Sequence, residues 1–467
     1  MTPIPFALRP SRRTVIQGMA GVAGAATVGT APFVIFGHAA NLPTRQDVVE
    51  FSKNAAAIAK FEAAIKEMQD RSAANPNDPK GWLINAKAHA DFCTFPGPNP
   101  AADPNQIHFC WWFLSWHRAY IVVIERKIRE IASDQTLCYP YWNWSTDRHI
   151  PIAYARPGSA LSNANRLVPN RAVDDGEVGY FPNDPVLKNL GVEALSAKIF
   201  EAKTRSDIRN SFGGIARPNP NKVYGNNRLE STPHGPIHNY VGGDMSDFET
   251  AGRDPIFFAH HGNLDRLWEI WRKDPVRKKT EPASDTFMQH EFVFTWLDGT
   301  PMKISAADTL DTEKLGYVYD NLDVFRPGVP LAMAAQAAED RPPPIASEKL
   351  KIPLPAQAAG ENERKMLEIT DVEQPDRPMT VGVYLKPANA PAGDLGVNVG
   401  SFAAVKSGGQ VAWPSQTLSF DITAAAAKYA GQELTVDLIP YRIRTQAAGP
   451  ETYQPLKYGQ MRIVTEK

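Results

Sequence analysis

The sequence predicts a mainly α-helical domain, rich in loops and built around a four-helix bundle, followed by an all-β sandwich domain. Two separated groups of histidines stand at spacings that suit a helical scaffold, and apolar residues recur at helical spacing near them. Beyond about residue 345 the pattern changes to short segments of alternating polarity, which is typical of strands. The run 331–345, rich in Ala and Pro, is the predicted linker.

Apolar periodicity places the helices. One helix is predicted over residues 47–68 and another over 117–131, where an apolar face is followed by a charged end. Many Pro, Asn and Gly residues occupy 134–230, so only short helices near 186–212 are expected there. Residues 231–275 should complete the bundle. In the C-terminal part, four segments are predicted to be strands: 366–370, 381–385, 418–422 and 434–439.

The composition predicts a soluble protein with more than one domain. The chain has 467 residues, 43% hydrophobic and 22% charged, with a formal net charge of -1. Positive and negative charges are nearly equal in number, and no cluster of basic residues stands out, which argues against a nucleic-acid partner. The 40 prolines exceed the usual share of about 5%, so long ordered loops should connect the helices.

Six histidines form the two groups, and each group has three: His89, His108 and His117, then His234, His238 and His261. Residues four apart lie on one helix face, so His234 and His238 can chelate one ion. His108 and His117 are nine residues apart, so His108 should precede or open the helix that carries His117. Each group is therefore predicted to bind a metal ion. His149 and His290 are interpreted as histidines that pack in the protein and bind no metal.

Copper and zinc both accept imidazole ligands, and the number of histidines does not separate them. Structural zinc sites usually close four positions, often with thiolates, but Cys93, Cys110 and Cys138 show no CxxC spacing. Three neutral imidazoles per ion leave an open face, and two such sites facing each other can hold dioxygen between two coppers. The paired arrangement favours copper.

The surrounding motifs carry a family resemblance. The first reads His108-Phe-Cys-Trp-Trp-Phe-Leu-Ser-Trp-His117-Arg-Ala-Tyr, and the second includes Asp254-Pro-Ile-Phe-Phe-Ala-His260-His261-Gly-Asn-Leu-Asp265. Over residues 45–325 the chain resembles the type-3 dicopper superfamily of tyrosinase, catechol oxidase and hemocyanin, and most of all the plant-type polyphenol oxidases. The resemblance implies two copper ions, dioxygen as co-substrate, no organic cofactor, and oxidation of small o-diphenols to o-quinones.

The resemblance also implies roles for residues beside the histidines. His261 matches the third ligand of the second copper, which leaves His260 beside the site as a supporting residue. Asp265 is expected to accept a ring N–H and fix a ligand's orientation; the alternative is an ion pair with Arg253 or Arg266.

Cys93 matches a cysteine bonded through a thioether to the second histidine of the first group, here His108. The alternative is a small buried thiol, which is the interpretation for Cys110 and Cys138.

Three further residues are candidates for the catalytic reaction. In the family, a glutamate four residues before the first histidine of the second group can hold a water that deprotonates monophenols, often with an asparagine directly after that histidine. Glu230 matches the glutamate, but Gly235 replaces the asparagine, and Asn239 is the candidate substitute. Phe248 matches an aromatic gate above the first copper, and a core anchor is the alternative. Diphenol oxidation is therefore expected, with monophenol hydroxylation as an additional activity left open.

The domains are expected to be a catalytic domain over 41–330, closed by the tyrosine motif Gly316-Tyr-Val-Tyr319, and a C-terminal domain over 346–467. By resemblance, the C-terminal domain covers the copper site and keeps the enzyme latent. The alternative is a domain that only stabilises or docks the protein.

The first forty residues read as a twin-arginine export signal. Ser11-Arg12-Arg13-Thr14-Val15-Ile16 precedes a run of Gly, Ala and Val, broken by Pro32, which argues against a permanent membrane span. We expect export of a folded protein by the twin-arginine machinery to a bacterial periplasm or the outside.

Two other functions remain open at this point. The same copper centre can oxidise o-aminophenols, and hemocyanin-like proteins bind dioxygen reversibly without oxidising a substrate.

Overall fold

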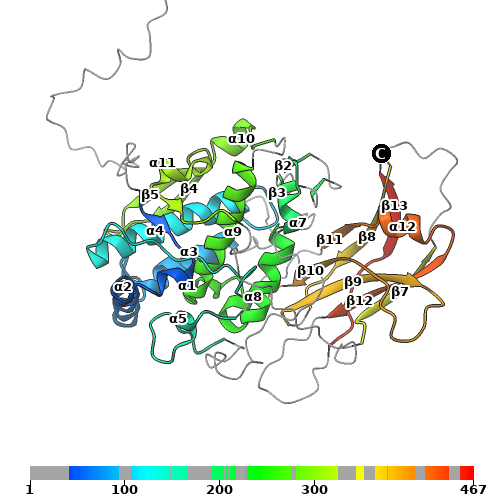
Figure 1. The fold of residues 1–467 in the computed structure, drawn as a ribbon, viewed down its shortest axis with the longest axis horizontal. Coiled ribbons are helices and arrows are strands. Elements are labelled where there is room, and N and C mark those ends of the chain that lie inside the picture. Colours follow the sequence, from blue (N-terminus) through cyan, green and yellow to red (C-terminus); the bar gives the residue numbers. More distant parts are fainter. Residues whose placement is uncertain are drawn as a thin grey trace, which may run out of the picture.

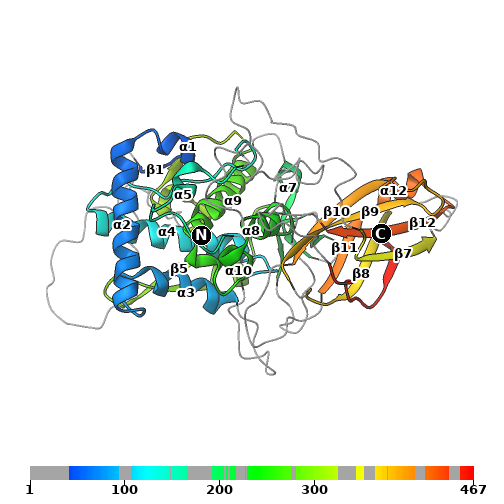
Figure 2. The same ribbon diagram turned by 90° about the horizontal axis from the view of Figure 1, so that it is seen from below.

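A computed structural model describes most of the chain from residue 42 onward. The described residues are 42–93, 107–147, 149–166, 192–203, 207–208, 211–216, 227, 229–274, 280–323, 343–351, 363–375, 377–404, 416–440 and 453–466. A helical part and a part made of β-strands lie side by side along the longest axis (Figures 1 and 2). The predicted export signal, and the predicted linker up to residue 342, lie outside the described residues.

The helical part contains helices and short strands in the following order: β1 Thr44–Arg45, α1 Val48–Phe51, α2 Ala55–Ala74, α3 Trp82–Cys93, α4 Phe113–Ala132, α5 Ile152–Ala155, α7 Val192–Leu195, β2 Ile199–Ala202, β3 Ser211–Ile215, η3 Glu230–His234, α8 Gly235–Val241, η4 Gly243–Ser246, η5 Ala251–Arg253, α9 Ile256–Lys273, α10 Asp285–Met288, β4 Glu291–Thr295, β5 Pro301–Ser305, η6 Asp308–Leu310, α11 Thr312–Leu315 and β6 Val318–Tyr319.

The single helix predicted over 47–68 is two helices. Asp47 caps α1 by accepting a hydrogen bond from the Val49 N–H, and α1 ends after one turn at Phe51. The side chain of Asn54 then accepts from the Ala57 N–H and starts α2, which continues to Ala74. Capping side chains of this kind compete with a continuous helix, so the apolar period alone did not reveal the break.

The prediction of short helices near 186–212 is confirmed by α7 but is wrong where the chain forms strands. There, β2 and β3 pair in parallel, with Ile199 opposite Ser211. Phe200 and Phe212 are fully buried. Aromatic and β-branched side chains that pack on alternate positions favour strands.

Four helices, α3, α4, α8 and α9, carry His89, His117, His238 and His261 respectively, and α4 packs directly against α9. Nearly every residue of α4 and α9 is buried, as a helix surrounded by others requires. The chain ends of this part meet in a parallel pair, with Thr44 of β1 opposite Val318 of β6. The tyrosine motif therefore lies next to the start of the described chain.

The C-terminal part contains two antiparallel sheets. Their strands are β7 Ala346–Lys351, β8 Arg364–Val372, β9 Met379–Pro387, β10 Val397–Ala404, β11 Gln416–Asp421, β12 Glu433–Pro440 and β13 Met461–Glu466, with α12 Thr423–Lys428 between β11 and β12. One sheet has the order β10-β9-β12-β7 and the other β11-β8-β13. Three of the predicted strands lie within β8, β9 and β12; the fourth corresponds to β11, which ends one residue earlier, at Asp421.

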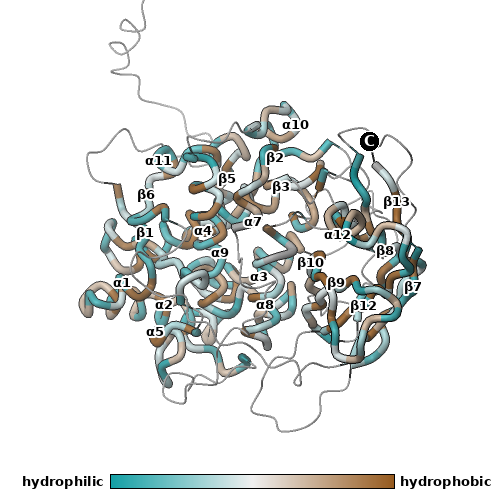
Figure 3. Tube along the Cα trace, turned by 45° about the vertical axis from the view of Figure 1, so that its right-hand side comes forward, coloured by the Kyte–Doolittle hydropathy of each residue, from teal (hydrophilic) through white to brown (hydrophobic). Residues whose placement is uncertain are grey.

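The two parts have separate apolar cores. One cluster of buried residues runs from Val48 to Tyr317, and a second, which joins side chains of both sheets, runs from Ile345 to Met461. Hydrophobic positions are present in both parts in Figure 3. Among the described residues, no helix is both long and apolar enough to cross a bilayer.

Candidate metal centre

The first histidine group assembles as predicted. His89 comes from α3, His117 from the first turns of α4, and His108 from the turn that precedes α4. All three side chains are buried, and one ligating nitrogen from each lies within 4.8 Å of the other two. His108 therefore precedes the helix of His117, as the nine-residue spacing required.

The second group contains one more histidine than expected. His234 ends the π-helical turn η3, His238 lies in α8, and both His260 and His261 lie in α9. Ligating nitrogens of these four buried residues lie within 4.8 Å of one another. Pro233 lies inside the π-turn, and such turns often occur at functional sites because they redirect one side chain.

Backbone carbonyls orient four of the rings through Nδ1. The Nδ1 atoms lie 2.8 Å from Phe248 O for His89, 2.7 Å from Phe113 O for His117, and 2.6 Å from Met245 O for His238. His234 Nδ1 makes a longer contact, 3.3 Å, with Glu230 O. A carbonyl can only accept, so each of these Nδ1 atoms carries the proton and each Nε2 offers its lone pair.

Burial keeps the rings neutral. It lowers the pKa of His89 to about 3 and that of His238 to about 4, and it lowers the pKa values of the other histidines in both groups as well. Nε2 of His117 and Nε2 of His234 are buried and have no hydrogen-bond partner. Buried neutral acceptors without a donor fit a metal ion, and all-imidazole groups suit copper.

The two groups face each other. The rings of His117 and His261 are stacked with centroids 4.0 Å apart and an interplanar angle of 6°. His108 and His234 are also stacked, at 5.8 Å and 25°. The two groups can therefore hold two ions side by side.

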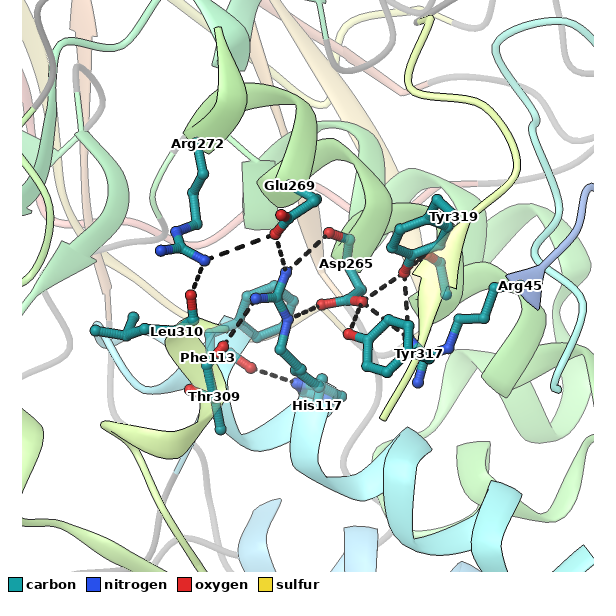
Figure 4. Close-up of polar contacts among 12 residues, drawn as sticks. Arg45, Phe113, His117, Asp265, Glu269, Arg272, Thr309, Leu310, Tyr317 and Tyr319 are labelled. Atoms are coloured by element: carbon teal, nitrogen blue, oxygen red, sulfur yellow. Dashed lines mark hydrogen bonds and ion pairs between the residues drawn. The ribbon is translucent and has the colours of Figure 1, made fainter. Parts of the chain in front are cut away.

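A buried charge cluster joins the helices of the two groups (Figure 4). Asp265 of α9 pairs with Arg118 of α4, the residue after His117, and its second carboxylate oxygen lies 2.8 Å from Arg45 Nη1. Tyr317 and Tyr319 donate their hydroxyl hydrogens to the same oxygen. Both arginines are fully buried, and Asp265 shares the balance of their charges with Glu125, which pairs with Arg45, and with Glu269, which lies 3.5 Å from Arg118.

The hydrogen bond expected from a ligand ring to Asp265 is therefore absent. His261 Nδ1 has no hydrogen-bond partner, and the carboxylate is saturated by the arginines and tyrosines. The alternative partners were also wrong: among the described residues, Asp265 pairs with Arg45 and Arg118, and Arg266 donates to the carbonyls of Asn321 and Asp323. The four-residue spacing does not show which way the carboxylate turns.

Cys93 lies between two histidines. Its Sγ is 3.3 Å from His108 Nδ1 and 3.3 Å from His89 Nε2, and burial raises the pKa of the thiol. Cys110 and Cys138 are buried thiols, as expected.

Glu230 links the two groups at the edge of the site. Its Oε1 accepts a hydrogen bond of 2.8 Å from the N–H of Phe109, a residue held at a φ of 61°, and its Oε2 is buried without a partner. Burial raises the pKa of the carboxyl to about 8. Glu230 lines a pocket together with His234 and Phe248.

Asn239 does not lie where a water beside the metals would need it. Its Nδ2 donates to Ala404 O of β10 at 3.1 Å, and a longer contact of 3.5 Å reaches Thr380 Oγ1. Asn239 directly follows His238 on α8. Adjacent residues on a helix point in different directions, so the side chain of Asn239 leaves the face that carries His238. Its expected role as a substitute for the missing asparagine was therefore wrong.

The C-terminal part closes the pocket beside the second group. A Cβ placed on Gly235 would lie 2.4 Å from Ala403 Cβ, so strand β10 approaches α8 more closely than any other residue at this position would allow. Phe402, Ala403 and Ala404 line the pocket opposite Glu230. The cavity volume is about 30 Å³, which is small for a phenol ring.

Phe248 lies at the edge of the first group, a position compatible with either a gate or a core anchor. Its ring is 4.6 Å from the ring of His108 at 66°, and it lines the pocket. His149 and His290 lie outside both histidine groups.

Sequence reasoning missed two features of the site. Trp144 donates its indole N–H to His260 Nδ1 at 3.2 Å. Phe402 reaches the pocket from a strand more than 160 residues beyond His238. Trp144 lies 116 residues before His260, and no local pattern in the sequence indicates this contact or links β10 to α8.

Comparison with known proteins agrees with this site. Residues 79–274 match the common central domain of tyrosinase, and residues 282–326 match the polyphenol oxidase middle domain. The chloroplastic polyphenol oxidase of Malus domestica is 28% identical over 362 residues, 67% of this chain and 60% of that protein. The chloroplastic (+)-larreatricin hydroxylase of Larrea tridentata is 31% identical over 296 residues, 57% of this chain and 47% of that protein. The chain spans about half the length of the curated relatives it matches.

Solved structures extend the likeness. Latent apple tyrosinase aligns with 92% of this chain and 98% of its own at a TM-score of 0.65 and 23% identity, which shows a shared fold. Polyphenol oxidase of Grenache (Vitis vinifera) covers 68% of this chain and 96% of its own, with a TM-score of 0.51 and 27% identity. The matched central domain, the relatives and the two facing histidine groups together show that this chain belongs to the type-3 dicopper superfamily of tyrosinases and polyphenol oxidases.

Proposed function

We propose that the protein is a copper-dependent oxidase that converts o-diphenols to o-quinones with dioxygen. The observation that carries this proposal is the pair of facing histidine groups whose Nδ1 atoms are anchored on carbonyls, so that Nε2 lone pairs converge. Two bound copper ions would supply the binding and reduction of dioxygen. The substrate supplies two electrons and two protons per quinone, so two catechols reduce one dioxygen to two waters.

The ligands in this proposal are His89, His108 and His117 for the first copper, and His234, His238 and His261 for the second. Copper content tests the assignment. His238→Ala and His117→Ala should each reduce the content from two ions to one per chain; retention of both ions by either variant would contradict it.

Glu230 is proposed to position a water beside His234 for the deprotonation of monophenols. Its Oε1 is held by the Phe109 N–H, and its Oε2 is free to hold that water. Glu230→Gln should reduce monophenol hydroxylation more than diphenol oxidation. Equal losses in both activities would indicate a purely structural carboxylate.

The C-terminal part, proposed to be a β-sandwich domain over 346–467 after a linker at 331–345, is proposed to keep the enzyme latent. The support is the contact of Gly235 with Ala403, the hydrogen bond from Asn239 to Ala404 O, and the pocket that is small for a phenol. Proteolysis in the linker should raise the rate of catechol oxidation. An unchanged rate would leave the domain only a stabilising or docking role.

Phe248 is proposed to restrict access to the first copper. Its ring covers His108 while its carbonyl orients His89. Phe248→Ala should widen the range of accepted phenols or accelerate turnover, because only the ring is removed. Unchanged kinetics would leave it as a core anchor.

Cys93 is proposed to form a thioether with His108, supported by the Sγ–Nδ1 distance of 3.3 Å. The bond would replace the thiol S–H and a ring C–H in a two-electron oxidation by dioxygen at the proposed copper site, and it would fix the ring of His108. The mass of a peptide joining the two residues would be lower by two hydrogens than the sum of its parts. Two separate, unmodified peptides would contradict the bond.

Residues 1–40 are proposed to be a twin-arginine signal for export to a periplasm or the outside. The plant relatives are named chloroplastic, so a transit peptide is the competing interpretation. In a bacterial host, the wild-type protein should reach the periplasm, and a double change of Arg12 and Arg13 to Lys should retain it in the cytoplasm. Equal distribution of both forms would exclude the signal.

Oxygen uptake with catechol, a matched monophenol and an o-aminophenol tests the whole proposal. Uptake that depends on catechol is expected. Uptake only with the o-aminophenol would change the substrate class, and a reversible dioxygen adduct without any turnover would indicate an oxygen carrier.

A further inference from the structure

His260 has no role in the ligand assignment, although it lies among the ligands. Its ring is 5.0 Å from the rings of His238 and His261, and 5.6 Å from that of His234. It is fully buried, and its Nε2 has no hydrogen-bond partner. Four imidazoles therefore compete for the second ion, and distance alone does not exclude any of them.

The partner of Nδ1 distinguishes His260 from the other three. The indole N–H of Trp144 can only donate, so His260 Nδ1 must be the acceptor of the 3.2 Å hydrogen bond. A neutral imidazole has one N–H and one lone pair, so the proton is on Nε2. At His238, the carbonyl of Met245 imposes the opposite tautomer, because a carbonyl only accepts.

We propose that His260 is a fixed hydrogen-bond donor at the second copper rather than a ligand, and that Trp144 enforces this role by fixing its tautomer. The other three histidines would hold the second copper. The Nε2–H of His260 would stabilise negative charge on a small anion, or on an anionic oxygen, bound at that copper. This inference rests on the proposed dicopper site and adds a positioning role for Trp144. Such a donor is strongest in a dry, buried site like this one.

The tautomer can be read directly by NMR of the full-length protein loaded with copper(I), which is diamagnetic, with ¹⁵N-labelled histidine. The signals of His260 are identified by their loss in His260→Gln. They should show Nε2–H in the wild type and in Trp142→Phe, a matched control whose indole donates elsewhere, to Asp147 O. Trp144→Phe should add the Nδ1–H form. An Nδ1–H tautomer in the wild type would overturn the proposal.

Copper content separates this inference from the function it rests on. A wild-type protein that binds fewer than two ions would refute the dicopper proposal, and the tautomer would still be measured in the copper-free protein. With two ions bound, His260→Gln should keep both and His261→Gln should lose one. Loss of copper from His260→Gln alone would make His260 the ligand.

Azide tests the donor itself. Titration of the oxidised protein, followed by the absorption of the copper–azide complex, should show binding about 10-fold weaker in His260→Leu, since a hydrogen bond to an anion contributes roughly that factor. His260→Gln, which keeps an N–H, should lose less. Equal azide affinity in the wild type and in a folded His260→Leu or His260→Gln variant would contradict the role of donor.

Discussion

The two histidine groups use the same donors but are built differently. The first draws on α3, α4 and the turn before α4, and it is surrounded by Cys93 and the ring of Phe248. The second comes from α8, α9 and a π-turn, contains a fourth histidine, and lies directly beneath strand β10. Residues 402–404 line the pocket beside the second group, together with Glu230 and Phe248. The proposed latency would therefore act at the second copper, whereas the proposed gate, Phe248, would act at the first.

Removing the carboxylate that joins the two groups should have the largest effect. Asp265→Asn would leave Arg45 and Arg118 buried with one counter-charge fewer, and breaking a buried pair in this way costs about 3–5 kcal/mol. The free energy of unfolding, measured with denaturant, reports the loss. Asp70→Asn removes the exposed pair with Lys66 and should cost less than about 1 kcal/mol. Equal effects would mean that the cluster does not hold α4 and α9 together.

A single methyl group added at Gly235, beside the second histidine group, should weaken the contact between α8 and strand β10 of the C-terminal part. Gly235→Ala places a Cβ 2.4 Å from Ala403 Cβ, and overpacking of this kind costs about 1–3 kcal/mol, or about 5- to 150-fold in an equilibrium. Catechol oxidation by the uncleaved protein should rise at least about 5-fold, since that is the lower end of this range.

Ala403→Gly is the matched partner for that change, because it removes the atom that Gly235→Ala would meet. The double variant should return towards the low rate of the wild type. A rise that persists in the double variant, or that is also seen after linker cleavage, would locate the effect inside the copper site rather than at the contact with β10.

The effect with the narrowest pH range should be confined to the half that holds the first copper. Burial lowers the pKa of Lys127 to about 8, and the side chain donates to Asn85 Oδ1 of α3. The folded state therefore loses this proton at lower pH than the unfolded chain does, so stability should increase as pH rises from about 8 towards 10.5. Lys127→Met should remove an increase on the order of 2 kcal/mol from the denaturant-measured stability. An identical pH profile in both proteins would contradict this account.

The sequence predicted the features that depend on the spacing of residues, but not those that depend on the direction in which a side chain points. Both histidine groups, the order of His108 before its helix and the four C-terminal strands followed from residue types and periods. The break at Asn54 and the strands β2 and β3 did not, because capping and burial override a local period.

Long-range direction explains the misses at the site. Asp265 and Asn239 were placed by their distance in sequence from a ligand, but Asp265 turns to Arg45 and Arg118, and Asn239 to strand β10. The tautomer of His260 depends on Trp144, which is 116 residues away. Contacts at such separations are set by packing of the whole domain, and a single sequence contains no local signal for them.

Oxygen uptake by the copper-loaded protein with catechol, before and after cleavage of the linker, tests the central claim most directly. The account predicts two copper ions per chain and a catechol-dependent uptake that increases when β10 is released from α8. A protein with two copper ions that consumes no oxygen with catechol in either form would contradict it.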